Sequence, residues 1–258
     1  MKTGKLYLIP TNLSDPFTPT QILPAMVIAT ARRLNYYIAE NAKTARAFLK
    51  QVGMSRPLSD ISIVELNNQT PTTALIDLIA PLLAGEDIGL VSEAGAPGVA
   101  DPGALVVALA HQHDIQVVPL VGPSSLLLGL MASGLNGQTF AFHGYLPQEK
   151  SARINAIAAL EMESRRRNMT QMFIETPYRN QAIYADLIAT LGPTTQLSIA
   201  RDLTGLREEV TTMRVSAWRK KIESPERLPT LFLFLAESAQ PKAKRDAPRS
   251  KKIVKPSP

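Results

Sequence analysis

Short apolar runs alternate with longer segments along the first half of the chain. The runs have the length of strands and occupy residues 6–9, 36–39, 61–66, 88–91 and 117–120. The segments between them suit helices and occupy residues 20–35, 44–52, 71–83, 102–113 and 124–131. This alternation predicts βαβ units and a mostly parallel sheet.

The pattern changes after residues 134–137, where two glycines close the first half. Residues 139–142 read as its last strand. Beyond them, helices are predicted at residues 150–162, 178–191 and 216–221, and strands at 172–174, 196–200, 209–215 and 230–236. Because successive strands follow with little helix between them, the second sheet is expected to be smaller and mixed. We therefore predict an α/β protein of two lobes, residues 1–144 and 145–238, with a disordered basic tail at 239–258.

The basic character of the chain is concentrated at its C-terminal end. The net charge is +6, but residues 240–258 hold seven of the 28 basic residues and one of the 22 acidic residues. The rest of the chain therefore carries 21 of each sign. A segment rich in lysine, arginine and proline does not favour folding alone, so we expect a flexible arm. Such an arm either binds a polyanion or only keeps the protein in solution.

Composition and motifs exclude several classes of protein. The absence of cysteine removes disulfides, thiolate metal sites and cysteine nucleophiles, and it favours the cytoplasm. No signal peptide is recognised, and no apolar run approaches the roughly 20 residues of a membrane helix. The dinucleotide, P-loop and nucleophile-elbow motifs are missing. His111 and His113 diverge on a predicted helix, so we expect no metal site.

Loops of small residues follow three of the predicted strands, at residues 10–12, 92–101 and 121–125. Residues 92–103 hold three glycines and two prolines, which permit close backbone approach to a ligand. Because the carboxyl ends of parallel strands meet at the same edge, the loops are expected to line one crevice. They offer backbone groups and hydroxyls but no catalytic triad. We therefore predict a small polar ligand that itself supplies the reactivity, with an ordinary strand-to-helix turn as the alternative.

Six motifs, in order, resemble the tetrapyrrole methylase superfamily. They lie at residues 92–97 with 101–103, then 119–125, 132–135, 142–147, 174–179 and 200–204. Within the superfamily, their order and spacing are similar to the bacterial enzymes that methylate a ribose 2′-hydroxyl of 16S ribosomal RNA. The resemblance covers about residues 5–237. It implies the two-lobed class III methyltransferase fold, S-adenosylmethionine as cofactor between the lobes, a homodimer, and ribosomal RNA or the small ribosomal subunit as partner.

The resemblance also implies which residues contact the cofactor. In the first half these are Pro10, Ser92, Glu93, Ala94, Gly95, Pro97, Gly122, Pro123, Ser124 and Ser125. The adenine would face the second lobe around Ala200 and Arg201. Most of these positions fall in the three loops already described.

Methyl transfer to a hydroxyl requires a group that accepts the hydroxyl proton. Among the matched residues, Glu93 and His143 are the candidates. Glu93 is alternatively a carboxylate that holds loop amides, and His143 a surface histidine. Substrate binding is expected from Glu175, Tyr178 and Arg179. Arginine pairs with phosphate or carboxylate, so Arg179 and Arg201 suit a substrate or a structural ion pair equally.

Departures from the motifs indicate a divergent branch. The first loop lacks the glycine of P-I-G-N-L, and residues 39–43 read A-E-N-A-K in place of A-E-D-T-R. Residues 65–69 lack both histidines of the H-x-H-N-E region. Most of the cofactor loops keep the residues of the family, whereas the changes fall on residues expected near the methyl acceptor. A small molecule such as a tetrapyrrole is therefore an alternative substrate. A non-catalytic cofactor-binding dimer is a further alternative. Residues 165–167, three consecutive arginines, favour RNA but also suit a solvated helix end.

Overall fold

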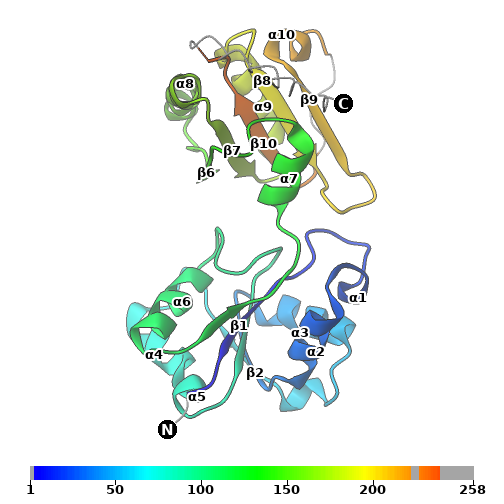
Figure 1. Cartoon of the computed structure of the whole chain (residues 1–258), viewed down its shortest axis with the longest axis vertical. Helices are drawn as coiled ribbons and strands as arrows, with labels where there is room; N and C mark the ends of the chain where they lie inside the picture. The colour runs from blue at the N-terminus through cyan, green and yellow to red at the C-terminus, as the bar shows by residue number, and fades with distance from the viewer. Residues whose placement is uncertain (1–2, 222–226, 239–258) are drawn as a thin grey trace, which may run out of the picture.

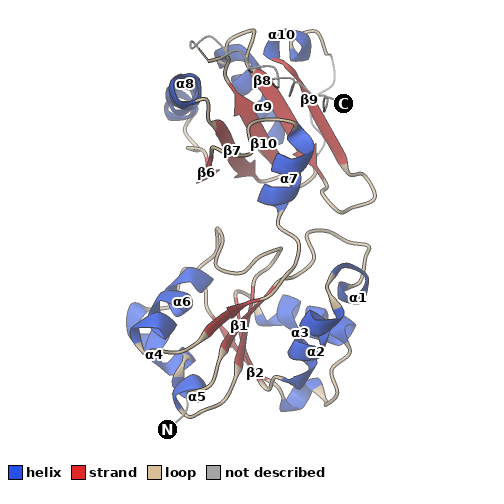
Figure 2. Ribbon diagram, viewed as in Figure 1, coloured by secondary structure: helices blue, strands red, loops and turns tan. Residues whose placement is uncertain are grey.

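The computed structural model describes residues 3–221 and 227–238. They form two lobes, the first from the earlier part of the chain and the second from the later part (Figure 1). The tail predicted at residues 239–258 lies outside the described residues. The lobes are stacked end to end, each built on its own sheet (Figure 2).

The first lobe is built on the predicted parallel sheet. Its strands are β1 (Leu6–Ile9), β2 (Tyr36–Ala39), β3 (Ser62–Glu65), β4 (Ile88–Val91) and β5 (Val117–Pro119). They lie in the order β3-β2-β4-β1-β5, and each pair is parallel. All four residues of β4 are buried, as expected of a parallel strand covered on both faces.

Helices cover both faces of this sheet. One face carries α1 (Pro19–Ile22), α2 (Ala25–Arg33) and α3 (Ala42–Val52), and a 3₁₀ turn η1 (Leu58–Asp60) follows α3. The other carries η2 (Thr72–Ala74), α4 (Leu75–Leu78), α5 (Ala80–Leu83) and α6 (Gly103–Gln112). The single helices predicted at residues 20–35 and 71–83 are therefore wrong. Pro24 and Pro81 lie at these breaks, and proline lacks the N–H that a continuous helix requires.

The second lobe holds a mixed sheet. Its strands are β6 (Phe140–Tyr145), β7 (Thr170–Glu175), β8 (Gln196–Arg201), β9 (Glu209–Arg214) and β10 (Thr230–Leu235), in the order β6-β7-β10-β8-β9. Only the β6–β7 pair of these is parallel. Phe232 and Phe234 of β10 pack toward α8 (Lys150–Arg167), α9 (Asn180–Thr190) and α10 (Val215–Trp218). Leu231 and Leu233 pack toward α7 (Ser125–Ser133) on the opposite face.

Strand β6 lies in the second sheet, although the sequence pattern placed it at the end of the first lobe. The second sheet accordingly has five strands and is not the smaller of the two. Helix α7 already packs on the second sheet, because a Cβ added to Gly129 would lie 2.4 Å from Leu231 Cδ2 of β10. The lobe boundary at residue 144 stays a prediction. The position of α7 leads us to propose that the lobes are joined at residues 120–124.

Candidate active site

The loops after β1, β4 and β5 meet at one edge of the first sheet. These strands are neighbours, and β1 and β4 leave the sheet toward opposite sides, which creates a crevice at their carboxyl ends. Thr11 N donates to Gly95 O at 2.9 Å, and Gly95 N donates to Thr11 O at 3.3 Å. The convergence predicted from the sequence is therefore present.

Two glycines allow the loops to approach this closely. Gly95 has φ +73°, and a Cβ there would lie 2.9 Å from Leu13 Cδ2 and 3.4 Å from Pro123 O. A Cβ on Gly122 would lie 2.3 Å from Pro10 Cβ. The side chain of Leu13 at Gly95 and the ring of Pro10 at Gly122 thus occupy the space that a Cβ would need.

The Asp101 carboxylate holds the long loop in shape. Its oxygens accept hydrogen bonds from Gly98 N at 2.9 and 3.0 Å and from Gly103 N at 2.7 Å. Burial raises the pKa of Asp101, and these amide donors act in the opposite direction. The amide-holding role that we considered for Glu93 therefore belongs to Asp101.

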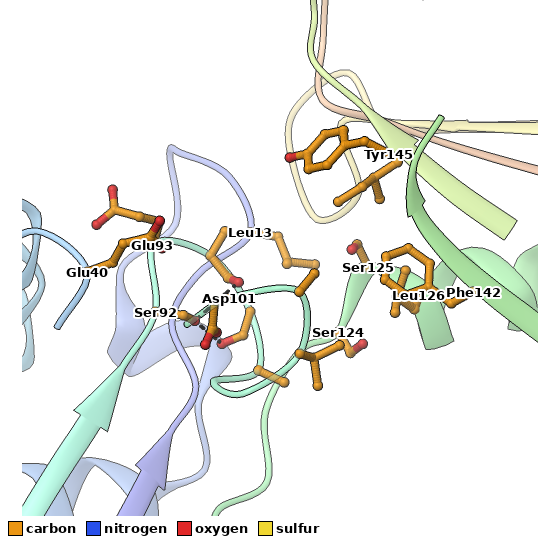
Figure 3. A pocket seen from close by; sticks show the side chains of 16 residues that line it. Leu13, Glu40, Ser92, Glu93, Asp101, Ser124, Ser125, Leu126, Phe142 and Tyr145 are labelled. Atoms are coloured by element: carbon orange, nitrogen blue, oxygen red, sulfur yellow. Dashed lines mark hydrogen bonds between the residues drawn. The ribbon is translucent and has the colours of Figure 1, made fainter. Parts of the chain in front are cut away.

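A cavity of about 310 Å³ opens above these loops, between the lobes (Figure 3). Polar side chains line it from the first lobe and from α7, and larger side chains from the second lobe. The lining residues include Glu40, Ser92, Glu93, Asp101, Ser124, Ser125, Leu126, Phe142, Tyr145 and Ile174. Phe142, Tyr145 and Ile174 were part of the matched motifs, but the sequence did not single them out.

A second cavity of about 280 Å³ adjoins the first and extends into the second lobe. The two cavities share Leu13, Ala94, Ser125, Tyr145 and Ile174. The further lining offers apolar surface from Pro177, Ala200, Leu203, Pro229 and Leu231, and it also contains the carboxylates of Glu175 and Asp202. Together the cavities offer an elongated site with an acidic end and an apolar end.

Three carboxylates form the acidic end, from Glu40, Glu93 and Asp101. Glu40 and Glu93 lie side by side in Figure 3. Burial raises the pKa of Glu40, and the negative charges of Glu93 and Asp101 raise it further. Glu93 Oε1 accepts a 2.5 Å hydrogen bond from Thr44 Oγ1. Among the described residues, no group of three or more metal-ligating side chains is arranged to hold a metal ion.

Sequence reasoning missed Glu40 as a site residue. It directly follows β2, whose last residue, Ala39, pairs with Val91 of β4, so Glu40 lies beside the loop that carries Glu93. Asn41, where the family motif has aspartate, caps α3 by accepting from Lys43 N at 2.8 Å and Thr44 N at 3.4 Å. Because asparagine and aspartate both serve as N-caps, the change from aspartate to Asn41 preserves the start of α3.

The predicted cofactor contacts divide into two groups. Those that line the two cavities are Ser92, Glu93, Ala94, Gly95, Ser124, Ser125 and Ala200. Pro10, Pro97, Gly122 and Pro123 are not among the lining residues; Pro10, Gly122 and Pro123 support the loops from behind. Arg201 forms an ion pair with Glu209 instead of facing either cavity.

Of the residues predicted for proton uptake or substrate binding, several lie away from the two cavities. His143 lines neither cavity, and its Nε2 hydrogen-bonds Gln171 Oε1 at 2.6 Å. Glu175 lines the apolar cavity and pairs with Arg179 at 3.2 Å. Arg179 also donates to Pro147 O at 3.2 Å, whereas Tyr178 is 83% exposed at the surface. Arg179 and Arg201 therefore both hold structural ion pairs.

The first lobe also makes contacts with the second across the cavities. Leu13 packs against the cluster of Leu130, Ala200, Leu203 and Leu231. Ser14 Oγ donates to Leu203 O at 3.3 Å. The loop after β1 therefore belongs to the walls of both cavities and to the core of the second lobe.

Comparisons with known proteins fit this architecture, although no protein-family model matches the chain. The chain is 33% identical over 209 residues to a protein of a Synechocystis species named ribosomal RNA small subunit methyltransferase I, covering 80% of this chain and 69% of that one. It is 29% identical over 240 residues to the protein of that name from Escherichia coli O157:H7, covering 92% and 79%.

Two solved structures share the fold at low sequence identity. The methyltransferase CobJ has a TM-score of 0.60 at 13% identity, over 91% of this chain and 95% of that one. Uroporphyrin-III-C-methyltransferase from Thermus thermophilus has a TM-score of 0.52 at 17% identity, over 90% and 92%. The predicted two-lobed fold is confirmed.

Proposed function

Because the chain belongs to the ribosomal RNA small subunit methyltransferase I family, we propose that it transfers a methyl group from S-adenosylmethionine to a ribose 2′-hydroxyl of ribosomal RNA in the small subunit. The observation that carries the proposal is the meeting of the three small-residue loops at two adjoining cavities between the lobes.

The residues present fit S-adenosylmethionine. The cavity volumes, about 310 and 280 Å³, together suit a ligand of nucleoside size with a side chain. The apolar cavity around Ala200 and Leu231 suits adenine. The carboxylates of Glu40 and Glu93 complement the positive charge of a sulfonium. Ser92, Ala94, Gly95, Ser124 and Ser125 would hold the remainder through backbone and hydroxyl groups.

When bound, S-adenosylmethionine supplies a methyl group that is already activated by the sulfonium. The protein's task is therefore to align the acceptor oxygen, to exclude water and to take up the hydroxyl proton. Glu93 lines the acidic cavity and has an oriented carboxylate, so we propose it as the proton acceptor. His143 was the other candidate, but its engagement with Gln171 favours Glu93. Glu175 and Arg179 would act by shaping the apolar cavity.

We also propose a homodimer formed through the outer face of α7. Between its terminal Ser125 and Ser133 this helix holds only apolar residues, yet Leu127 is 54% and Met131 78% exposed. A helix of this composition is normally covered on all sides. A second copy that presents the same face in a two-fold arrangement would bury both residues.

We place the protein in the cytoplasm, where ribosomal RNA is found. The absence of cysteine suits a reducing compartment. In the described part of the chain, none of the helices combines the length and the apolar character that a membrane crossing requires.

The proposed function is tested by following radioactive methyl from labelled S-adenosylmethionine into small ribosomal subunits from a strain that lacks the protein. We expect label in ribosomal RNA at a ribose, and calorimetric binding of S-adenosylmethionine. Label in a small molecule, and not in RNA, would overturn the RNA substrate and favour the alternative of a small-molecule substrate such as a tetrapyrrole. The absence of cofactor binding at millimolar concentration would overturn the methyltransferase assignment for this chain.

A further inference from the structure

A third cavity lies beside the acidic end of the proposed donor site. Its volume is about 470 Å³, and it lies between α3 and the loops after β1 and β4. It shares Leu13, Ser92 and Glu93 with the cavity of about 310 Å³. A molecule that fills it therefore reaches the proposed proton acceptor from the side of α3.

The lining of this cavity suits a nucleobase. Gln51 supplies a side-chain amide, Asn12 Oδ1 is a buried acceptor without a hydrogen-bond partner among the described residues, and the ring of Phe48, 9% exposed, reaches the lining from the core of the first lobe. The hydroxyls of Ser14 and Thr44 also line the cavity and already donate to Leu203 O and Glu93 Oε1. Amide and hydroxyl groups hydrogen-bond base edges, and aromatic side chains contact their faces, in proteins that recognise single-stranded RNA. The carboxylates in the lining, Asp15 and Glu93, belong to the loops and not to the helix.

Helix α3 adds a row of positive charge next to the cavity. Of its 11 residues, Lys43, Arg46 and Lys50 are basic and exposed, and none is acidic. In the described part of the chain, none of these three forms an ion pair. Their spacing of three, four and seven residues places them along one side of the helix, next to Ala47 of the cavity.

The helix terminus itself is not the anion site. The amide of Ala42 donates to Glu65 Oε1 at 2.8 Å, and those of Lys43 and Thr44 donate to Asn41 Oδ1. The exposed basic side chains of α3, and not its first amides, are therefore the groups that can meet a phosphate chain, although Arg46 Nη1 also donates to Ala42 O at 3.5 Å.

The arginine run of α8 offers a weaker surface. Glu163 pairs with Arg166 at 2.6 Å and with Arg167 at 2.5 Å, so one acid offsets two of the three arginines. No acid is placed on α3 in the same way, which makes α3 the stronger candidate for a phosphate contact.

Resting on the proposed function, we infer that the substrate RNA lies along α3 as a single strand, with its phosphates on Lys43, Arg46 and Lys50 and an unpaired base next to the methylated nucleotide in the third cavity. Each basic residue that neutralises a phosphate adds to the salt dependence of binding. The surface therefore predicts a salt signature that can be measured on binding alone.

The test uses the full chain and a fluorescein-labelled single-stranded oligouridine as probe. We expect Lys43→Gln/Arg46→Gln/Lys50→Gln to weaken binding at least about tenfold near 100 mM salt. The slope of log Kd against log salt should fall by about two, since each single-strand contact contributes about 0.7. The matched control, Arg165→Gln/Arg166→Gln/Arg167→Gln on α8, should change binding less than about threefold. Equal losses in both variants, or an unchanged slope in the first, would overturn the inference.

A second pair of variants tests the cavity. Ala47→Trp fills it from an exposed helix position and should raise the KM for ribosomal RNA about tenfold or more, with the Kd for S-adenosylmethionine unchanged. Ala158→Trp, at an exposed position of α8, is the control. An active wild type with an Ala47→Trp variant equal to its control would refute this inference alone. A wild type that neither binds the cofactor nor transfers methyl would refute the proposed function instead.

Discussion

Thr44 Oγ1 donates a 2.5 Å hydrogen bond to Glu93 Oε1 and so ties the first turn of α3 to the loop after β4. Glu93 lines both the donor cavity and the cavity beside α3. The bond therefore orients a carboxylate that faces both the proposed methyl donor and the proposed RNA path.

Glu93→Gln should lower kcat for methyl transfer about 100-fold, because general-base catalysis contributes on the order of 10²–10⁴. The Kd for S-adenosylmethionine should rise by a smaller factor, less than about tenfold by calorimetry, because the variant also loses one of the two charges that complement the sulfonium. His143→Gln is the matched test of the other candidate, and it should leave kcat within about threefold because His143 lines neither cavity. A larger loss in His143→Gln than in Glu93→Gln would reverse the assignment.

Gly122→Ala should weaken S-adenosylmethionine binding about tenfold or more, and it should cost about 1–3 kcal/mol of unfolding free energy through overpacking. The added methyl would lie 2.3 Å from Pro10 Cβ, so the loops after β1 and β5 must separate. Gly137→Ala is the control, because a Cβ there meets nothing within 4 Å. Calorimetry and chemical denaturation measure both quantities. Cofactor affinity equal in the two variants would show that this loop contact does not shape the site.

Glu40→Gln should raise the thermal stability at neutral pH. In the folded protein the pKa of Glu40 lies above its ordinary value, because burial and two nearby carboxylates disfavour the charge. The folded state then binds more protons than the unfolded state, so stability falls as pH rises from the ordinary pKa through the raised one. The amide removes this penalty, and the gain should vanish below about pH 4, where an unperturbed glutamate is also largely protonated. Melting temperatures of both proteins between acid and neutral pH would measure the difference; a gain that persists in acid would contradict the electrostatic cause.

Leu127→Glu/Met131→Glu should convert the proposed dimer into a monomer, because the symmetric contact would bring like charges together in an apolar surface. Light scattering coupled to gel filtration measures the mass. Met162→Glu on α8, also a strongly exposed methionine at 70%, should leave the mass unchanged. Loss of the dimer in both variants, or in neither, would exclude the α7 face as the interface.

The first sheet and the meeting of its loops follow from alternation alone, since parallel strands fix which loop ends share an edge. Glu40 could not be found that way, because its place depends on Ala39 lying opposite Val91, a pairing between strands distant in sequence. That Asp101 and not Glu93 holds the loop amides depends on where the amides of Gly98 and Gly103 point. Residues 139–142 have the composition of a strand, and nothing local tells which sheet receives them. In sequence Arg179 suited a substrate or a structural ion pair equally, because its ion pair with Glu175 depends on how the chain turns after β7.

The contact of Leu13 with the second lobe has a consequence for how a large substrate enters and leaves. With the lobes joined at residues 120–124, as proposed above, any separation of the two lobes would have to pull Leu13 away from the cluster that contains Leu203 and Leu231. Exposing this apolar side chain to water opposes separation. Release of the methylated product would then compete with closure of the two lobes. The contact of Leu13 would therefore lower the rate of product release.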